Sequence, residues 1–328
     1  MINQSGISRH LKLNERAWRL AEHALEDCDG LGILEQRLPS GARVLDAGIQ
    51  ARGGYAAGRL LARLCMGGLG HVTYVPIVLE SETWSGLHVS TDHPSEVCMA
   101  AQYAGWAIAP PPGDYFAMGS GPLRAIARVE RELFSTLRYA EPAGRGVLVL
   151  EGRETPTDLV ATWIADKAGL APRDLIIAIA PTASIAGGVQ VAARVLETGL
   201  HKMHTLGFDV SLVEAASGTV PIPPTAQSDI RAIGRTNDCV LYGGQARYVI
   251  RADDRALEAL AESLPAQSSA DYGTPFLAIF ERYGRDFYKI DPLLFSPAEV
   301  WLTSATSGRT FHGGGVNASV LRASLFGE

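Results

Sequence analysis

Four polar side chains between residues 190 and 201 follow the spacing of one helix face. At about 100° per residue, Gln190, Arg194, Glu197 and His201 fall within roughly 60° of one another. A carboxylate can accept a proton from water, and a guanidinium can orient that carboxylate through charge-assisted hydrogen bonds. These residue types therefore suit general-base chemistry by Glu197 with support from Arg194, and Gln190 and His201 are further orienting groups.

The segment before these side chains supplies the elements that must position them. Residues 175–180 form an uninterrupted apolar run, which predicts a strand buried on both faces. A glycine-containing turn over residues 181–188 follows, and the spacing predicts one helix over residues 189–203. The beginning of this helix offers unpaired N–H groups at the edge of a buried sheet. We therefore expect a catalytic site there.

An Arg and a Glu three residues apart on a helix also have a simpler interpretation. Most such pairs are solvated ion pairs that contribute roughly a few tenths of a kcal/mol. The presence of Gln190 and His201 favours the catalytic interpretation, because a solvated face typically carries a mixture of Lys and Glu. His201 and His204 are close in sequence, but no third metal ligand is visible, so no metal is expected.

The composition indicates a globular, enzyme-sized protein. The chain has 328 residues, 47% hydrophobic and 20% charged, which is enough to bury the cores of two domains. The net charge of −6 and the lack of a Lys/Arg cluster argue against nucleic-acid binding. No apolar run approaches the roughly 20 residues of a membrane span, and residues 1–10 lack the apolar core of a signal peptide.

The cysteines indicate a reducing, cytoplasmic setting. Cys28, Cys65, Cys98 and Cys239 are widely separated and form no Cys-x-x-Cys pair, so neither a zinc ribbon nor a redox dithiol is expected. Cys65 and Cys98 stand in apolar helical patterns that are typical of buried thiols.

Helical and strand-like segments alternate along the chain, which predicts a mixed α/β (α+β) fold. Further helices are expected over residues 13–24, 56–66, 94–105, 125–137, 155–167, 252–263, 275–283 and 317–326, and strands over 44–49, 72–79 and 146–151. Thr155 with Asp158 is expected to cap the helix that ends at residue 167, and Pro76 indicates an edge strand or a bulge.

We expect two α/β lobes, over residues 1–145 and 146–328, which need not each be continuous in sequence. The segment 141–146 is the best candidate for a link between them. Several common sites are not supported. The chain has no P-loop and no Gly-x-Ser-x-Gly elbow, and Thr73 stands where a dinucleotide-binding loop that begins at Gly68 needs its third glycine.

Taken together, the motifs resemble those of the methenyltetrahydromethanopterin cyclohydrolases. The resemblance runs from about Asn14 to Phe326. Its marks are Ser90–Pro94 with Gln102–Trp106, Tyr115–Pro122, Pro181–Ser184 with Gln190–Thr198 and His201–Lys202, Gly234–Asp238 with Tyr242–Gly243, and Tyr283–Pro292 followed by Phe295–Ala298. Each string is weak alone, but in this order and at these spacings they are specific.

The resemblance implies a reaction, a fold and an assembly. Such enzymes hydrate the cationic methenyl bridge of a reduced pterin to the N5-formyl compound, and they use no metal or redox cofactor. The catalytic pair of the family falls on Arg194 and Glu197. The resemblance further implies two tightly joined lobes with the substrate pocket between them, and a homotrimer. Leu293, Leu294, Phe295 and Trp301 form an apolar stretch that either contacts a partner or fills the core of the chain itself.

Substrate-binding residues are expected in three places. These are Gln190 and His201 beside the catalytic pair, Thr182 and Ser184 in the turn that precedes them, and the loop Gly119–Ser120–Gly121. The loop has an equal alternative as a tight turn before Pro122. The second candidate function is a non-catalytic pterin-binding protein of the same fold, and an oxidoreductase is disfavoured because the nucleotide fingerprint is missing.

Overall fold

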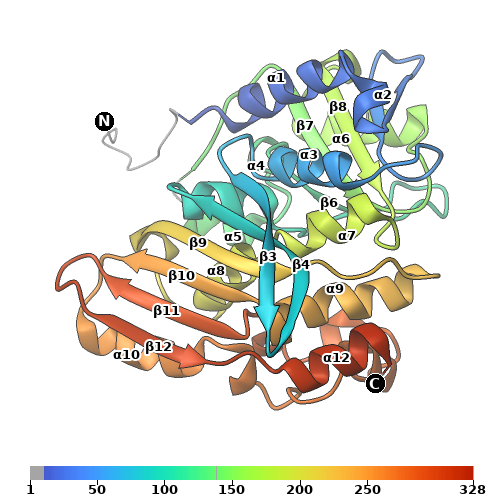
Figure 1. Ribbon diagram of the computed structural model, residues 1–328. Coiled ribbons are helices and arrows are strands. Elements are labelled where there is room, and N and C mark those ends of the chain that lie inside the picture. The colour runs from blue at the N-terminus through green and yellow to red at the C-terminus, as the bar shows by residue number, and fades with distance from the viewer. Residues whose placement is uncertain (1–10, 138, 328) are drawn as a thin grey trace. The chain divides into compact units, whose positions relative to one another are not determined.

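The chain forms two compact units, each built from two stretches of sequence (Figure 1). The computed structural model describes residues 11–137 and 139–327, apart from the side chain of Tyr288. Residues 1–10, where no signal peptide is expected, lie outside the described residues. The first unit comprises Met1–Gly70 and Glu96–Gln190, and the second comprises His71–Ser95 and Val191–Glu328. The chain therefore does not divide at residues 145 and 146.

The first unit contains a six-stranded mixed sheet in the order β1-β2-β8-β7-β6-β5. Strand β7, which we had assigned to the C-terminal lobe, pairs with β6 and β8 of this sheet. Strands β2, β8 and β7 are parallel neighbours, and the other pairs are antiparallel. The elements are α1 (Leu13–Leu25), α2 (Cys28–Leu31), β1 (Leu34–Arg37), β2 (Arg43–Asp46), α3 (Tyr55–Cys65), the π-helix η1 (Ser95–Gln102), β5 (Trp106–Ile108), β6 (Ala117–Ser120), α4 (Arg124–Ala127), α5 (Arg131–Thr136), β7 (Gly146–Glu151), α6 (Asp158–Ala168), the 3₁₀ turn η2 (Pro172–Asp174), β8 (Leu175–Ala180) and α7 (Ile185–Ala192).

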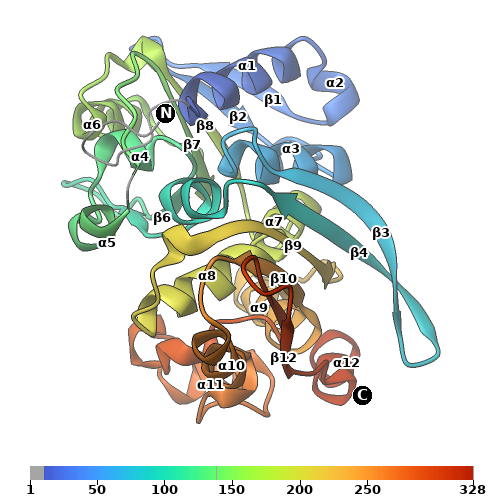
Figure 2. The ribbon, with the colours of Figure 1, turned by 90° about the vertical axis from the view of Figure 1, so that its left-hand side faces the viewer.

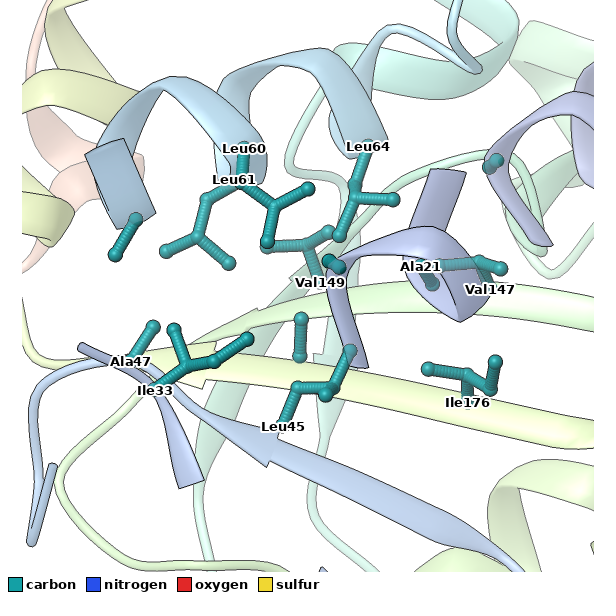
Figure 3. Close-up of a cluster of buried hydrophobic side chains, with 14 of the residues drawn as sticks. Ala21, Ile33, Leu45, Ala47, Leu60, Leu61, Leu64, Val147, Val149 and Ile176 are labelled. Carbon is teal, nitrogen blue, oxygen red and sulfur yellow. The ribbon is translucent and has the colours of Figure 1, made fainter. Parts of the chain in front are cut away.

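Alternate residues of the central strands pack into two separate cores. Val147 and Val149 of β7 face a cluster formed with Leu60, Leu61 and Leu64 of α3 (Figure 3). Their neighbours Leu148 and Leu150 face the opposite cluster, which includes α6. Figure 2 shows α6 and α3 on opposite sides of β7 and β8. Both faces of β8 are covered, as its continuous apolar sequence predicts.

The second unit also holds a six-stranded mixed sheet, in the order β12-β11-β10-β9-β4-β3. Only β10 and β11 are parallel among its described pairs. The elements are β3 (His71–Leu79), β4 (Glu82–Thr91), α8 (Val195–Thr205), η3 (Val210–Leu212), β9 (Val213–Pro221), α9 (Asp229–Gly243), β10 (Gln245–Ile250), α10 (Asp254–Ser263), η4 (Ala266–Ser268), α11 (Phe276–Arg282), η5 (Phe287–Lys289), η6 (Pro292–Leu294), β11 (Glu299–Ser304), β12 (Thr310–Gly314) and α12 (Ala318–Phe326).

One face of this second sheet packs against helices. Ala246, Tyr248 and Ile250 of β10 are buried, whereas Arg247 and Val249 between them are exposed. Helices α8 and α10 lie on the buried face, where α8 contacts β9 and β10 and α10 contacts β11 and β12. Strand β3 is the last strand of the order, so the expectation that Pro76 marks an edge strand is confirmed. The mixed α/β class holds for both units.

Three predictions for helices outside residues 189–203 differ from the structure. The segment 94–105 contains a π-helix, in which the N–H of Tyr103 donates to the carbonyl of Cys98, five residues earlier, at 2.8 Å. The predicted helix 125–137 is two short helices, because Arg128 adopts a left-handed conformation with φ of 47°. The cap of α6 is Thr157 rather than Thr155, since the Thr157 hydroxyl accepts the N–H of Val160.

The predicted link 141–146 belongs to the first unit. The buried carboxylate of Glu141 accepts the N–H of Asn14 at 3.0 Å and the hydroxyl of Tyr139 at 2.7 Å. It thereby fixes the beginning of α1 beside the entry to β7, so this segment is anchored to the first unit at Glu141. Among the described residues, no helix combines the length and apolar character that crossing a membrane requires.

Candidate functional site

The four polar side chains of the predicted helix face are divided between two helices. Gln190 lies in α7, whereas the other three belong to α8 and its N-terminal cap. Helix α7 begins at Ile185 and ends at Ala192, and α8 begins at Val195. At the break, the N–H of Arg194 donates to the carbonyl of Val191, three residues back, at 3.0 Å. Arg194 has φ of −81° and ψ of 6° and occupies the position before the first turn of α8. The prediction of a continuous helix over 189–203 is therefore wrong.

The turn before α7 is also shorter than predicted, because Ser184 starts the helix early. Its hydroxyl donates to the carbonyl of Pro181 at 2.7 Å and accepts the N–H of Gly187 at 3.0 Å. Glycine is needed at position 187 inside the helix, because a Cβ atom there would overlap the Pro181 carbonyl. Helix α7 therefore includes the glycines that we had assigned to the turn.

Arg194 and Glu197 are both buried at the beginning of α8. Their exposed fractions are 7% and 4%. A solvated ion pair would be largely exposed, so the burial contradicts the simpler interpretation of this pair. Arg194 occupies the position before the first turn of α8 and Glu197 lies within that turn, so both belong to the beginning of this helix. The first turn of a helix also stabilises a carboxylate through the positive end of the helix dipole.

His201 lies one turn beyond Glu197 on the same helix. Its side chain is half-buried, and its backbone carbonyl accepts the Thr205 hydroxyl at 3.0 Å. The second unit therefore contains three of the nine predicted site residues, namely Arg194, Glu197 and His201. The other six belong to the first unit.

In the first unit, Cys65 brings two predicted site residues together. The Cys65 sulfur lies 3.2 Å from the Ser120 hydroxyl and 3.7 Å from the Gln190 side-chain oxygen. Cys65 is the last residue of α3, Ser120 the last of β6, and Gln190 lies in α7. All three side chains are buried, which confirms the buried thiol predicted for Cys65. No local sequence pattern indicates that this thiol lies beside Ser120 and Gln190.

Gly119 and Ser120 end strand β6, and only Gly121 belongs to the turn that follows, where the backbone holds it in place. Gly121 has φ of 103°, and its N–H donates to the carbonyl of Ala101 at 2.7 Å. A Cβ atom at this position would lie 3.2 Å from the Val147 carbonyl oxygen. A residue with a side chain would be strained there, so the turn needs glycine.

Two acidic residues that were not predicted as site residues lie at the carboxyl ends of the parallel strands. The Thr182 hydroxyl, just after β8, donates to the carboxylate of Glu151 at the end of β7. Asp46 ends β2 and accepts the N–H groups of residues 48, 49, 50 and 51. Burial raises the pKa of Asp46, but these four hydrogen bonds outweigh it, and the pKa is lowered overall.

An acidic residue at the end of an apolar strand is the sequence signal that could have indicated Asp46 and Glu151. The carboxyl ends of parallel strands are a common place for ligand-binding residues in α/β proteins. Among residues 11–137 and 139–327, no three His, Cys, Asp or Glu side chains are grouped so that they could hold a metal ion.

Comparisons with known proteins place the chain in a family. The cyclohydrolase (MCH) family model matches residues 12–325. A methenyltetrahydromethanopterin cyclohydrolase of Methylobacterium organophilum is 43% identical over 98% of this chain and 99% of its own length. Proteins of the same name from Methylobacillus flagellatus and Methanococcoides burtonii are 42% and 37% identical, over 95% and 96% of this chain and 95% and 98% of their own lengths. The chain therefore belongs to the cyclohydrolase (MCH) family, as the order and spacing of its motifs predicted.

Proposed function

We propose that this protein hydrates 5,10-methenyltetrahydromethanopterin, or its dephospho form, to the N5-formyl compound. The reaction is reversible and serves one-carbon transfer in formaldehyde oxidation. The family match and the names of the relatives support the substrate. The observation that carries the catalytic assignment is the burial of Arg194 and Glu197 at the beginning of α8.

Glu197 acts as the general base in this proposal. The methenyl carbon lies between two nitrogens that share a positive charge, so it is electrophilic without a Lewis acid. As water attacks this carbon, Glu197 accepts one of its protons. The adduct then collapses: the carbon–N10 bond breaks, N10 takes the proton from Glu197, and the hydroxyl proton leaves to solvent as the formyl C=O forms. Metal and redox cofactors are not needed for this sequence.

Arg194 orients the Glu197 carboxylate and keeps it ionised. A guanidinium fork can hold a carboxylate in one plane, whereas an ammonium acts as a point charge. An ionised Glu197 also attracts the cationic substrate, and that attraction is stronger at a buried site than in water. Arg194→Lys should therefore recover only part of the kcat that Arg194→Ala loses, with a modest change in KM.

The remaining predicted site residues bind and orient the pterin. We assign this role to Gln190 and His201, to Thr182 and Ser184, and to the segment Gly119–Ser120–Gly121. Thr182 and Ser120 have hydroxyls bonded to Glu151 and Cys65, so their orientation is set by neighbours of the same unit. Oriented polar groups of this kind favour one substrate geometry over others.

The test is Glu197→Gln, which removes the base with little change in shape. We expect kcat to fall by about 10² to 10⁴ while the methenyl chromophore still binds. Glu258→Gln, on the exposed surface of α10, is the matched control and should keep the wild-type rate. Retention of more than about a third of kcat would remove Glu197 from this role. Binding without turnover by the wild-type protein would support the alternative, a non-catalytic pterin-binding protein.

We also propose that the protein is a cytoplasmic homotrimer. The support for a trimer is the family resemblance. The apolar stretch near residue 294 adds no support, because it packs within its own unit. Leu294 is fully buried, and the ring of Phe295 lies 5.7 Å from that of Phe276 and 6.2 Å from that of Phe287. Trp301 is half-buried, and the Arg247 guanidinium carbon lies 4.0 Å from the centre of the Trp301 ring.

A further inference from the structure

The hydroxyl of Tyr248 contacts the backbone of α8 next to Glu197. Tyr248 lies on β10, is 1% exposed, and donates a hydrogen bond to the carbonyl oxygen of Leu196 at 3.1 Å. The Leu196 carbonyl and the Glu197 N–H belong to one planar peptide group. A bond to that oxygen therefore restrains the peptide plane from which the Glu197 side chain starts.

Gly199 lets α8 come close enough for this contact. A Cβ atom at Gly199 would overlap the Tyr248 hydroxyl and lie 3.0 Å from the Tyr248 Cζ and 3.3 Å from the Pro297 Cδ. Only a residue without a side chain fits between the helix and these two neighbours. The close approach and the hydrogen bond are thus two parts of one contact.

A second contact fixes the other end of the same helix. Lys202 is fully buried, and its Nζ donates to the Pro265 carbonyl and to the Ser268 hydroxyl, each at 2.8 Å. At about 100° per residue, Gly199 lies roughly 200° and Lys202 roughly 140° around the helix from Glu197. The helix is therefore held from the side opposite to Glu197.

From this arrangement we propose that Tyr248 is a positioning residue for Glu197, which it holds through the peptide group that joins Leu196 to Glu197. The inference rests on the proposed role of Glu197 as the base. The carboxylate must lie within hydrogen-bond reach of the attacking water, and a displacement of about 1 Å can cost up to about 10²-fold in rate. Tyr248 touches neither substrate nor water in this proposal, so it acts on kcat only through Glu197.

The first experiment is Tyr248→Phe, which removes one oxygen atom. We expect kcat to fall roughly tenfold, with KM changed by less than about twofold, because the base moves while the binding groups stay. Tyr242→Phe is the matched control. Its hydroxyl is also buried, but it bonds to the carbonyl of Thr274 at 2.6 Å and the N–H of Gly273 at 3.1 Å. Equal kcat in the two variants would overturn the proposal.

The second experiment separates positioning from a general loss of packing. In the Glu197→Gln background, adding Tyr248→Phe should leave kcat unchanged, since there is no base left to position. A further tenfold loss in the double variant would show that Tyr248 acts by another route. If Glu197→Gln alone keeps its activity, the assignment of Glu197 as the base fails. If it is inactive while Tyr248→Phe matches Tyr242→Phe, only the positioning role fails.

The third experiment uses Gly199. Gly199→Ala should lower kcat more than Tyr248→Phe does, because the added methyl group pushes α8 away from β10. In the Tyr248→Phe background the same change should cost less, since the overlapping hydroxyl is gone and only the contacts with the Tyr248 Cζ at 3.0 Å and the Pro297 Cδ at 3.3 Å remain. Circular dichroism on each variant checks that the fold is kept. Additive losses in kcat would contradict a contact between Gly199 and the hydroxyl.

Discussion

Replacing Lys202 with Met should change how stability depends on pH. Lys202 is fully buried between the Pro265 carbonyl and the Ser268 hydroxyl, neither of which carries a charge. Burial lowers the pKa of Lys202 from 10.5 to about 8, with partial compensation by the Asp291 carboxylate. The charged ammonium is thus less stable in the folded protein than in the unfolded chain.

The sign and size of the effect follow from proton linkage. Between pH 8 and 10.5 the unfolded chain holds the Lys202 proton more tightly than the folded protein, so stability rises with pH in this range. Below about pH 8 both states are charged, and the burial penalty amounts to roughly 3 kcal/mol. Raising the pH from 8 to 10 should remove about 2 kcal/mol of this penalty.

Urea unfolding of wild type and Lys202→Met at pH 8 and pH 10 measures the effect. The variant should lack the gain of about 2 kcal/mol, while other titrating groups contribute equally to both proteins. Lys289→Met is the control, because the Lys289 side chain is 65% exposed and should show the wild-type pH dependence. If wild type and Lys202→Met change in parallel between the two pH values, Lys202 does not carry a buried charge and the reasoning fails.

Four other outcomes are expected. Burial raises the pKa of Asp238 to about 7 despite hydrogen bonds from Ser324 and Phe276, so folding stability should fall as pH rises from about 4 to 7, and Asp238→Asn should abolish that fall in urea unfolding. Gly121→Ala should lower the free energy of unfolding by roughly 1 to 3 kcal/mol, because φ is 103° there, and an unchanged free energy would show that the turn relaxes. Prolonged chelation should leave activity intact. The finding of stoichiometric bound zinc, with activity lost when it is removed and restored when it is returned, would refute this. Light scattering should give three times the 34.9 kDa chain mass, and a mass of one or two chains would reject the trimer.

Apolar periodicity predicted the elements of the core well. The strand 175–180 is buried at every residue, and the first helix buries Ala17 and Ala21 as its spacing requires. These predictions succeed because burial of apolar side chains is the main determinant of both elements. The prediction that Pro76 marks an edge strand likewise followed from the missing N–H of proline.

The break between α7 and α8 could not be predicted from the sequence. Neither glycine nor proline stands at Ala193 or Arg194, so no local residue signals that the helical hydrogen bonds stop. Arg194 and Glu197 keep nearly the same spacing in either arrangement, because both belong to the beginning of α8. The spacing of Arg194 and Glu197 therefore identified the candidate pair, although the predicted helix extended across the break between α7 and α8.

The division of the chain was hidden for a different reason. Residues 71–95 form the hairpin β3–β4, which pairs with β9 more than a hundred residues later in the sequence. Pairing between distant strands leaves no mark in local composition, so the boundary at residues 145 and 146 seemed plausible. The contacts of the Cys65 thiol could not be predicted for the same reason, since its neighbours Ser120 and Gln190 are distant in sequence.

Strand β3 has a consequence for how molecules of this protein avoid one another. It is a nine-residue strand at the margin of its sheet, and Figure 2 shows it with β4 as a long hairpin. A strand of that length with one open side is a template onto which another chain can add, which is how ordered aggregates grow. Pro76 interrupts the template, because its ring occupies the place of a backbone donor. Replacing Pro76 would therefore favour aggregation between molecules without removing a hydrogen bond from the folded chain.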